Sequence, residues 1–105
     1  MKIECNHRDQ IIIIFPDYSS SGMWCNNCGC GIANPKEFYP EIPSQLIDLI
    51  ELWNEFWDFA SCYDVNKEHY QQLINRTGKT LAEKISKYHK CILGIERCKL
   101  DINHG

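Results

Sequence analysis

Four side chains near the N-terminus have the chemistry and the spacing of metal ligands. Cys5 and His7 form a Cys-x-His pair, Cys25 and Cys28 form a Cys-x-x-Cys pair, and seventeen residues separate the two pairs. Zinc in structural sites takes four thiolate or imidazole ligands, commonly delivered as two such pairs. We therefore predict one structural Zn²⁺ per chain, bound by these four residues. Because protein ligands fill all four positions, the ion is expected to stabilise the fold and to leave no place for a substrate.

The other cysteines leave alternatives open, since the chain has seven in all. Cys30 follows the Cys-x-x-Cys pair closely enough to replace Cys28 or His7 as a ligand. A shell of four thiolates would also suit an iron–sulfur cluster, which is the minor alternative. Three thiols outside the motif are expected to be buried and inert, like small apolar side chains: Cys62, Cys91 and Cys98.

No catalytic motif stands out in the sequence. A nucleophilic Cys91 assisted by His69 or His89 would need a third residue to orient the base, and none lies at a telling position. There is no phosphate-binding glycine loop, zinc-protease helix motif or serine elbow. We therefore predict that the protein is not an enzyme.

Two strands and a turn must bring the ligand pairs together. Ile3–Cys5 and Gln10–Phe15 are predicted strands, and the four successive isoleucines in the second favour an extended backbone. Residues 16–22 are rich in turn formers, so Met23 and Trp24 should return as the second strand of a hairpin. Gly29 gives the metal-binding turn its conformational freedom.

The remainder of the chain predicts an antiparallel helical hairpin. Three of the four prolines lie in residues 34–43, so no regular element should cross that linker. The first helix should begin at Pro43-Ser44 and end near Ala60, and the second should run from Asp64 or Asn66 to about His89. Residues 91–98 fit either a final strand or a helical extension, and the tail after Lys99 should fray.

Apolar periodicity predicts the inner face of each helix. The stripe of the first helix is Leu46, Ile50, Trp53, Trp57 and Ala60, widened by Leu49, Leu52, Phe56 and Phe59. The stripe of the second helix is Tyr70, Ile74, Thr77, Leu81, Ile85 and Tyr88, with Leu73 beside it. A glycine inside a helix costs about 1 kcal/mol against alanine, so Gly78 should permit the close approach of an aromatic ring, which we expect to be Trp53. Trp53 and Trp57 are thus expected in the core rather than on a base-stacking surface, whereas Trp24 either covers the ion or stays partly exposed.

Length and pattern together predict one α+β domain over residues 1–105. It consists of a zinc-binding β subregion (1–33), resembling a zinc ribbon, packed on a helical hairpin (43–90), with a short terminal segment (91–105). The longest apolar run, Ile11–Phe15, is far shorter than the roughly 20 residues of a membrane span. The first residues contain no apolar segment of a signal peptide, so we expect a cytoplasmic protein with reduced thiols.

Charge argues against nucleic acid as the first choice of partner. The chain has 11 basic and 14 acidic residues and a formal net charge of -3, whereas a protein that binds a phosphate backbone usually has a basic surplus. Four carboxylates lie at helical spacing opposite the apolar stripe of the first helix: Asp48, Glu51, Glu55 and Asp58. A solvated helix face is the simplest interpretation, and a docking surface for a protein with a basic surface is the functional one.

A larger pattern extends from Ser21 to Tyr88. Gly22-Met23-Trp24-Cys25-Asn26-Asn27-Cys28-Gly29 is followed by Ile42-Pro43, by Trp53-Asn54 and by Gly78-Lys79-Thr80-Leu81-Ala82. This order of motifs resembles a loose group of small uncharacterised bacterial zinc-binding proteins, in which a Trp-Cys-x-x-Cys-Gly knuckle precedes a helical hairpin. Some of them look like immunity proteins or antitoxins, and the resemblance implies a protein that acts by binding.

Two functions follow from these observations. The first is a zinc-stabilised module that binds and inhibits or regulates another protein, of the immunity, antitoxin or phage-inhibitor type. The alternative is a nucleic-acid-binding transcriptional regulator that uses the zinc hairpin. The basic residues available to it are Arg8, Lys79, Lys84, Lys87 and Lys90.

Overall fold

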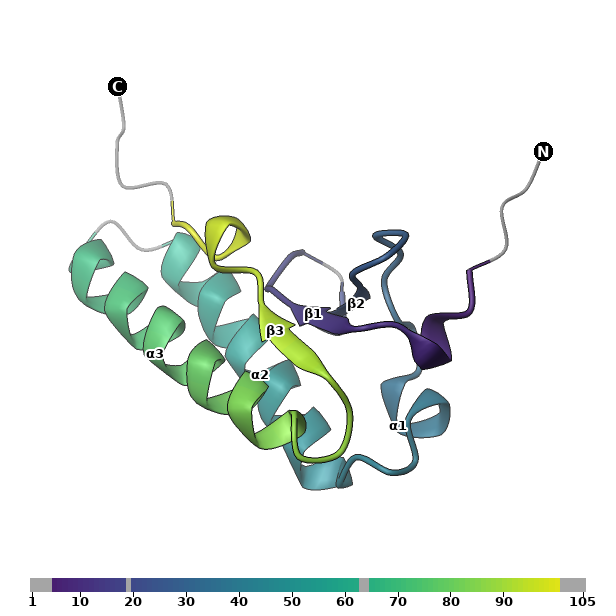
Figure 1. The fold of residues 1–105 in the computed structure, drawn as a ribbon. Helices are drawn as coiled ribbons and strands as arrows, with labels where there is room; N and C mark the ends of the chain where they lie inside the picture. The colour runs from purple at the N-terminus through teal and green to yellow at the C-terminus, as the bar shows by residue number, and fades with distance from the viewer. Residues whose placement is uncertain (1–4, 19, 63–64, 101–105) are drawn as a thin grey trace.

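A small three-stranded sheet and two long helices make up the α+β fold seen in the computed structural model (Figure 1). The structure describes residues 5–18, 20–62 and 65–100. The strands are β1 (Ile12–Ile14), β2 (Met23–Cys25) and β3 (Cys91–Leu93), and the helices are α1 (Pro35–Phe38), α2 (Ser44–Ser61) and α3 (Lys67–Ile85). Two single-turn 3₁₀ helices, η1 (His7–Asp9) and η2 (Ile95–Arg97), complete the elements.

The sheet has the strand order β2-β1-β3. β1 and β2 form the predicted antiparallel hairpin, in which Ile12 pairs with Cys25 and Ile14 with Met23. β3 lies on the other side of β1 and runs parallel to it, with Cys91 opposite Ile12. Residues 91–98, for which strand and helix were both open, are therefore a strand followed by the turn η2.

The strands are shorter than the sequence predicts. Gln10–Phe15 contributes only Ile12–Ile14 to the sheet. Of the predicted strand Ile3–Cys5, only Cys5 lies within the described residues, and it belongs to no strand. The backbone turns tightly there, because the His7 amide donates to the Cys5 carbonyl at 3.0 Å and the Gln10 amide to the His7 carbonyl at 3.1 Å.

The two long helices follow the prediction closely at their starts. α2 begins at Ser44, directly after Pro43, and α3 begins at Lys67, directly after Asn66; the alternative start at Asp64 lies outside the described residues. α3 ends at Ile85 rather than near His89. The hydroxyl of Ser86 lies within hydrogen-bond distance of the carbonyls of Ala82 (2.8 Å) and Cys91 (2.9 Å), so this side chain ties the end of the helix to the returning strand.

Among the described residues, no helix or strand crosses the proline-rich linker, as predicted, but the linker is not irregular throughout. It contains the short helix α1, which has Pro35 at its first position. Proline is tolerated there because its missing amide would have no partner inside the helix.

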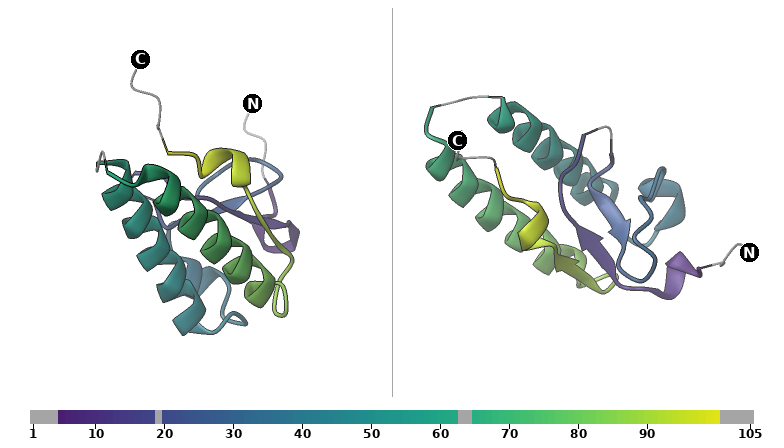
Figure 2. Two further views of the ribbon diagram at one scale, coloured as in Figure 1. Left: turned by 90° about the vertical axis from the view of Figure 1, so that its left-hand side faces the viewer. Right: turned by 90° about the horizontal axis from the view of Figure 1, so that it is seen from above.

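The helix pair packs against the sheet. α2 and α3 run antiparallel side by side, and β3 lies along α3 (Figures 1 and 2). The core between the layers is apolar: Ile12, Ile14 and Met23 from the hairpin, and Ile50, Trp53, Trp57, Ile74, Leu81 and Ile85 from the helices. The predicted approach of Trp53 to Gly78 is confirmed, because a Cβ atom on Gly78 would lie 2.7 Å from Trp53 Cζ2. None of the helices in the described part of the chain is both long and apolar enough to cross a bilayer.

The predicted stripe of α2 is buried at Ile50, Trp53, Trp57 and Ala60, but the residues expected to widen it are mostly exposed. Leu49 and Leu52, which were expected to widen that stripe, are 46% and 59% exposed, and Phe59 is also exposed. Ile47 and Asn54 are buried in their place. The sheet and hairpin turn lie against one side of α2 and α3 against another, so the arc that holds Leu49 and Leu52 contacts neither fully. Thr77 on α3 and Tyr88, which lies beyond the end of that helix, are exposed as well, contrary to the prediction.

Candidate metal centre

The two predicted ligand pairs meet at one end of the hairpin. One ligand atom from each of Cys5, His7, Cys25 and Cys28 can be chosen so that all four lie within 4.8 Å of one another. The Cys5 and Cys25 sulfurs are 3.6 Å apart, and Cys28 Sγ lies 3.4 Å from His7 Nδ1. These four residues therefore lie close enough to hold a metal ion.

Local backbone structure explains how each pair converges. Cys25 ends β2, and the chain then makes a tight turn in which the Gly29 amide donates to the Cys25 carbonyl at 2.8 Å and the Cys25 amide donates to the Cys30 carbonyl at 2.9 Å. Gly29 has φ of +78°, a left-handed conformation that side chains with a Cβ rarely adopt. On the opposite side, η1 bends the chain so that Cys5 and His7 face the same point.

Two of the six separations between the possible ligand atoms are close to those around a tetrahedral ion, and the others are at most 4.8 Å. With bonds of about 2.3 Å to sulfur and about 2.05 Å to nitrogen, the edges of a ZnS₃N tetrahedron are about 3.8 Å between sulfurs and about 3.5 Å from sulfur to nitrogen. The measured separations of 3.6 and 3.4 Å match these edges closely. A set of three thiols and one imidazole is typical of zinc sites in proteins.

Hydrogen bonding favours the thiolate form of both cysteines in the turn. Burial would raise the pKa of Cys25, but the backbone amides of Cys28 and Asn27 and the His7 ring donate to its sulfur and bring the pKa below the ordinary value. The backbone amide of Cys30 likewise lowers the pKa of Cys28. Amides aimed at sulfur stabilise its negative charge, so the turn is prepared for a cation.

The thiol pKa is raised rather than lowered at Cys5 and at Cys30. The side-chain amide of Asn27 donates to Cys5 Sγ at 3.3 Å and lowers its pKa, but burial and the neighbouring thiols of Cys25 and Cys28 outweigh this and raise it overall. Cys30 is exposed, and its hydrogen bond with Cys28 raises the pKa of the Cys30 thiol. Cys30 is next to the four-residue group without belonging to it.

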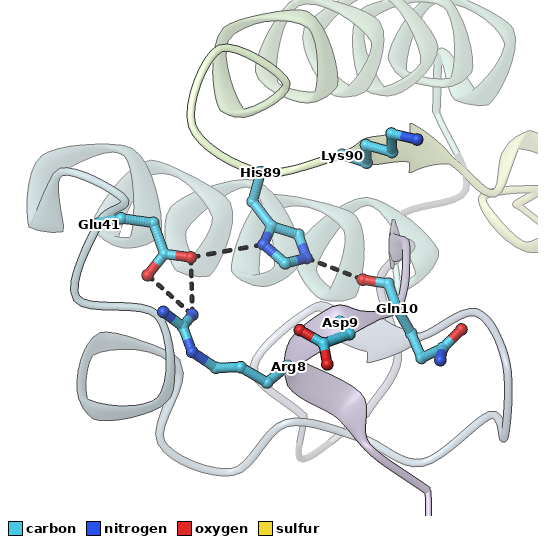
Figure 3. Close-up of a pocket in the computed structure, with 6 residues that line it drawn as sticks. All are labelled: Arg8, Asp9, Gln10, Glu41, His89 and Lys90. Carbon is cyan, nitrogen blue, oxygen red and sulfur yellow. Dashed lines mark hydrogen bonds and ion pairs between the residues drawn. The ribbon is translucent and has the colours of Figure 1, made fainter.

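A second polar cluster lies beside η1 and was not predicted (Figure 3). Arg8 Nη1 donates to both carboxylate oxygens of Glu41, at 2.8 and 2.7 Å. His89 lies between Glu41 and Gln10: its Nδ1 is 3.4 Å from the Glu41 carboxylate, and its Nε2 donates to the Gln10 carbonyl at 2.8 Å. These contacts connect the segment around His7 to the linker and to the residues just before β3.

Tyr39 adds a further connection to the same segment. Its ring is fully buried and its hydroxyl donates to the His7 carbonyl at 3.2 Å. Burial raises the pKa of Tyr39 to about 12, so the phenol stays a donor at neutral pH. This contact was not predicted from the sequence. Tyr39 lies in a proline-rich linker, and an irregular chain there would have left its ring exposed. The contact between Glu41 and His89 was also missed, because these two residues meet only in the folded chain.

The remaining thiols divide into two kinds. Cys91 and Cys98 are buried as predicted, and burial raises the pKa of each to about 12. A thiol with such a pKa is almost entirely protonated at neutral pH. Cys62 is exposed, contrary to the prediction, because it follows the last residue of α2 at the end of the helix pair.

The predicted partner surface is exposed to solvent. Asp48, Glu51, Glu55 and Asp58 are all exposed on α2, and Asp48 forms an ion pair of 2.6 Å with Lys36.

Trp53 and Trp57 are buried, as expected. Trp24 is half-buried: it stacks on Phe15 at a centroid distance of 4.5 Å and donates to the Phe15 carbonyl. It lies on the sheet face opposite Cys25 and does not cover the ligand group.

Comparisons with protein-family models, with curated proteins and with solved structures found no match to this chain.

Proposed function

We propose that this protein is a zinc-stabilised module that acts by binding another protein, and that the ion is structural. The observation that carries the metal assignment is the convergence of Cys5, His7, Cys25 and Cys28 within 4.8 Å of one another. Four protein ligands complete a tetrahedral shell, so the ion holds the hairpin to η1 and offers no open coordination position.

The surface of the helix pair supports the binding role. α2 exposes four carboxylates, and it also exposes Leu49 and Leu52, which a helix buried on one side would ordinarily turn inward. Acidic residues beside apolar ones suit a protein partner with a basic and apolar surface. The Trp-Cys-x-x-Cys-Gly knuckle and helical hairpin resemble small uncharacterised bacterial zinc-binding proteins, some of which look like immunity proteins or antitoxins. That resemblance implies the same mode of action, in which binding inhibits or regulates the partner.

The arrangement of basic residues gives less support to nucleic acid as the partner. Arg8, which a nucleic-acid surface on the hairpin would need, is held by both oxygens of Glu41. The four carboxylates of α2 would repel a phosphate backbone.

Affinity capture with the zinc-loaded protein tests this function. Wild-type protein and a Glu51→Lys/Glu55→Lys variant would be used as baits, and captured proteins identified by mass spectrometry. We expect a protein that the wild type retains and the variant retains poorly, with association that slows as salt screens the charges. The proposal fails if purified wild-type protein captures no protein selectively and instead binds DNA or RNA with submicromolar affinity near physiological salt.

A further inference from the structure

A groove of about 520 Å³ runs between α2 and α3. Leu49, Leu52 and Phe56 form its wall on α2, and Thr80 and Leu81 contribute from α3. Figure 1 shows the two helices lying side by side along their lengths. The groove therefore follows the helix axes.

The α2 wall presents apolar surface to solvent. Leu49 is 46% exposed and Leu52 is 59% exposed, one helical turn apart. Phe56 follows a turn later, and its ring meets Tyr70 of α3 edge-on at 5.7 Å. Exposed apolar side chains aligned along a groove mark sites where a partner docks, whereas apolar residues scattered singly do not.

The dimensions of the groove suit a single helix. Leu49 and Phe56 are seven residues apart, which corresponds to about 10 Å along α2. Arg76 and Lys84 on the opposite wall are eight residues apart, or about 12 Å along α3. A third helix would place about two turns in this length, with apolar side chains at positions i, i+3 or i+4, and i+7 pointing into the groove.

The two edges of the groove carry opposite charge. Successive residues of an α-helix are turned by about 100°, so Asp48 and Glu55 follow Leu52 around α2 on the side away from α3. Asp48 is already paired with Lys36 at 2.6 Å, so Glu55 supplies the negative charge of this edge. Arg76 and Lys84 line the groove on the α3 side. Glu51 and Asp58 lie farther around α2, toward the hairpin, and are not at this edge.

We propose that this groove binds an amphipathic helix of a partner protein, with Lys or Arg along the edge that lies over α2 and acidic residues along the edge that lies over α3. The proposal rests on the proposed protein-binding function and names both its surface and the chemistry of the partner. Of the four carboxylates that the sequence predicts as a partner surface, only Asp48 and Glu55 border the groove. A second copy of this chain is a poorer occupant, since two aligned copies would place one hollow against another and leave it unfilled.

A designed peptide provides the probe. It would have about four helical turns, with leucines at the i, i+4 and i+7 spacing, lysines on one flank and glutamates on the other. Its affinity for the zinc-loaded full chain would be measured by fluorescence anisotropy. A peptide with serines in place of the leucines is the control for apolar contact, and one with glutamates on both flanks is the control for charge.

Two matched pairs of protein variants locate the site. Leu52→Asp is compared with Val65→Asp, because both side chains are 59% exposed and only Leu52 lies in the groove. We expect Leu52→Asp to weaken peptide binding by about tenfold or more and Val65→Asp to leave it unchanged. Glu55→Lys should weaken binding more than Glu51→Lys, because only Glu55 borders the groove. Unchanged zinc content and circular dichroism would confirm that each variant is folded, and Leu49→Asp replaces Leu52→Asp if that variant is not.

Four outcomes would overturn the proposal. Equal affinity of the peptide for wild type and Leu52→Asp would place its site elsewhere. Absence of binding at millimolar peptide would remove the groove as a helix site. Self-association in sedimentation equilibrium that Leu52→Asp abolishes would assign the face to a second copy. A captured partner that binds Leu52→Asp as well as wild type would also reject the groove, while leaving the protein-binding function intact.

Discussion

The β layer and the helix pair differ in what holds them together. Each strand is three residues long, so the sheet has few backbone hydrogen bonds, and its ligand end lies partly at the surface with Cys28 exposed. The helices have 18 and 19 residues and bury Trp53, Ile74 and Leu81 between or beneath them. Short strands are marginal by themselves. We conclude that a bound metal would contribute mainly to the β layer, whereas apolar packing holds the helices.

Removing the metal should destabilise the β layer far more than the helix pair, and this is the largest effect that we expect. Structural zinc contributes folding free energy directly, so chelation or Cys25→Ser should destabilise residues 5–33 by more than about 3 kcal/mol. Hydrogen exchange followed by mass spectrometry should show lost protection there, while peptides from α3 remain protected.

Cys62→Ser is the matched control for this experiment, because Cys62 is an exposed thiol remote from the ligands in sequence. It should keep both the metal and the protection of residues 5–33. Equal loss of protection in both layers on chelation would show that the helix pair depends on the metal as much as the sheet does.

Gly78 tests the packing that holds the helix pair. A Cβ atom at this position would lie 2.7 Å from Trp53 Cζ2 and 2.8 Å from Leu93 Cδ1, so a larger side chain must displace both. We expect Gly78→Leu to cost about 2–3 kcal/mol in urea denaturation. The neighbouring exposed residue Lys79 provides the control, since Lys79→Leu adds the same side chain in solvent. If Gly78→Leu denatures at the same urea concentration as the wild type, the close approach of Trp53 is not real.

Asn54 tests the connection between the two layers. Its side chain is buried, accepts a hydrogen bond from the Asp17 amide at 2.8 Å and donates to the Ser20 carbonyl at 3.1 Å. Asn54→Leu leaves both backbone groups without this partner and should cost about 1–2 kcal/mol. Gln45→Leu on the exposed face of α2 should cost much less. A stability loss in Gln45→Leu as large as that in Asn54→Leu would reject this role of Asn54.

The smallest expected effect concerns Glu41 and acid. Hydrogen bonds from Arg8 hold the pKa of Glu41 below its usual range, so the ionised carboxylate stabilises the folded state. That contribution is present above the pKa of the unfolded chain, about 4.3, and is lost as the pH falls through the lower folded value. Glu41→Gln should therefore be less stable than the wild type by under about 1 kcal/mol near pH 7.

The difference between wild type and Glu41→Gln should vanish in strong acid. Comparing the two proteins at each pH separates this effect from acid release of a metal, which both would share. A difference that is the same at pH 7 and in acid would contradict the role assigned to the ionised Glu41.

Local spacing was enough to predict that Cys5, His7, Cys25 and Cys28 lie close together. It also predicted the hairpin and the starts of both long helices. Cys25 and Cys28 lie in one turn, and Ile12–Ile14 and Met23–Cys25 are separated by a single loop, so sequence neighbours determine these contacts. α2 starts directly after Pro43 and α3 directly after Asn66, although neither side chain caps its helix with a hydrogen bond.

The features that the sequence did not reveal depend on residues far apart in the chain. β3 pairs with β1 across nearly eighty residues, and Glu41 meets His89 only once α2 and α3 have folded between them. Helical periodicity identifies the apolar residues of α2 but does not reveal which of them the sheet and α3 will cover. Leu49 and Leu52 were for this reason assigned to the core, and Asn54 was not recognised as buried.

X-ray absorption at the zinc edge, on protein purified without chelators and checked for metal by elemental analysis, tests the central claim most directly. We predict about one zinc per chain, with three sulfur ligands near 2.3 Å and one nitrogen near 2.0 Å. Cys30→Ser should leave this spectrum unchanged, and His7→Ala should alter it. Protein without zinc, or a four-sulfur shell that loses one sulfur in Cys30→Ser and is unaffected by His7→Ala, would contradict the assignment of Cys5, His7, Cys25 and Cys28.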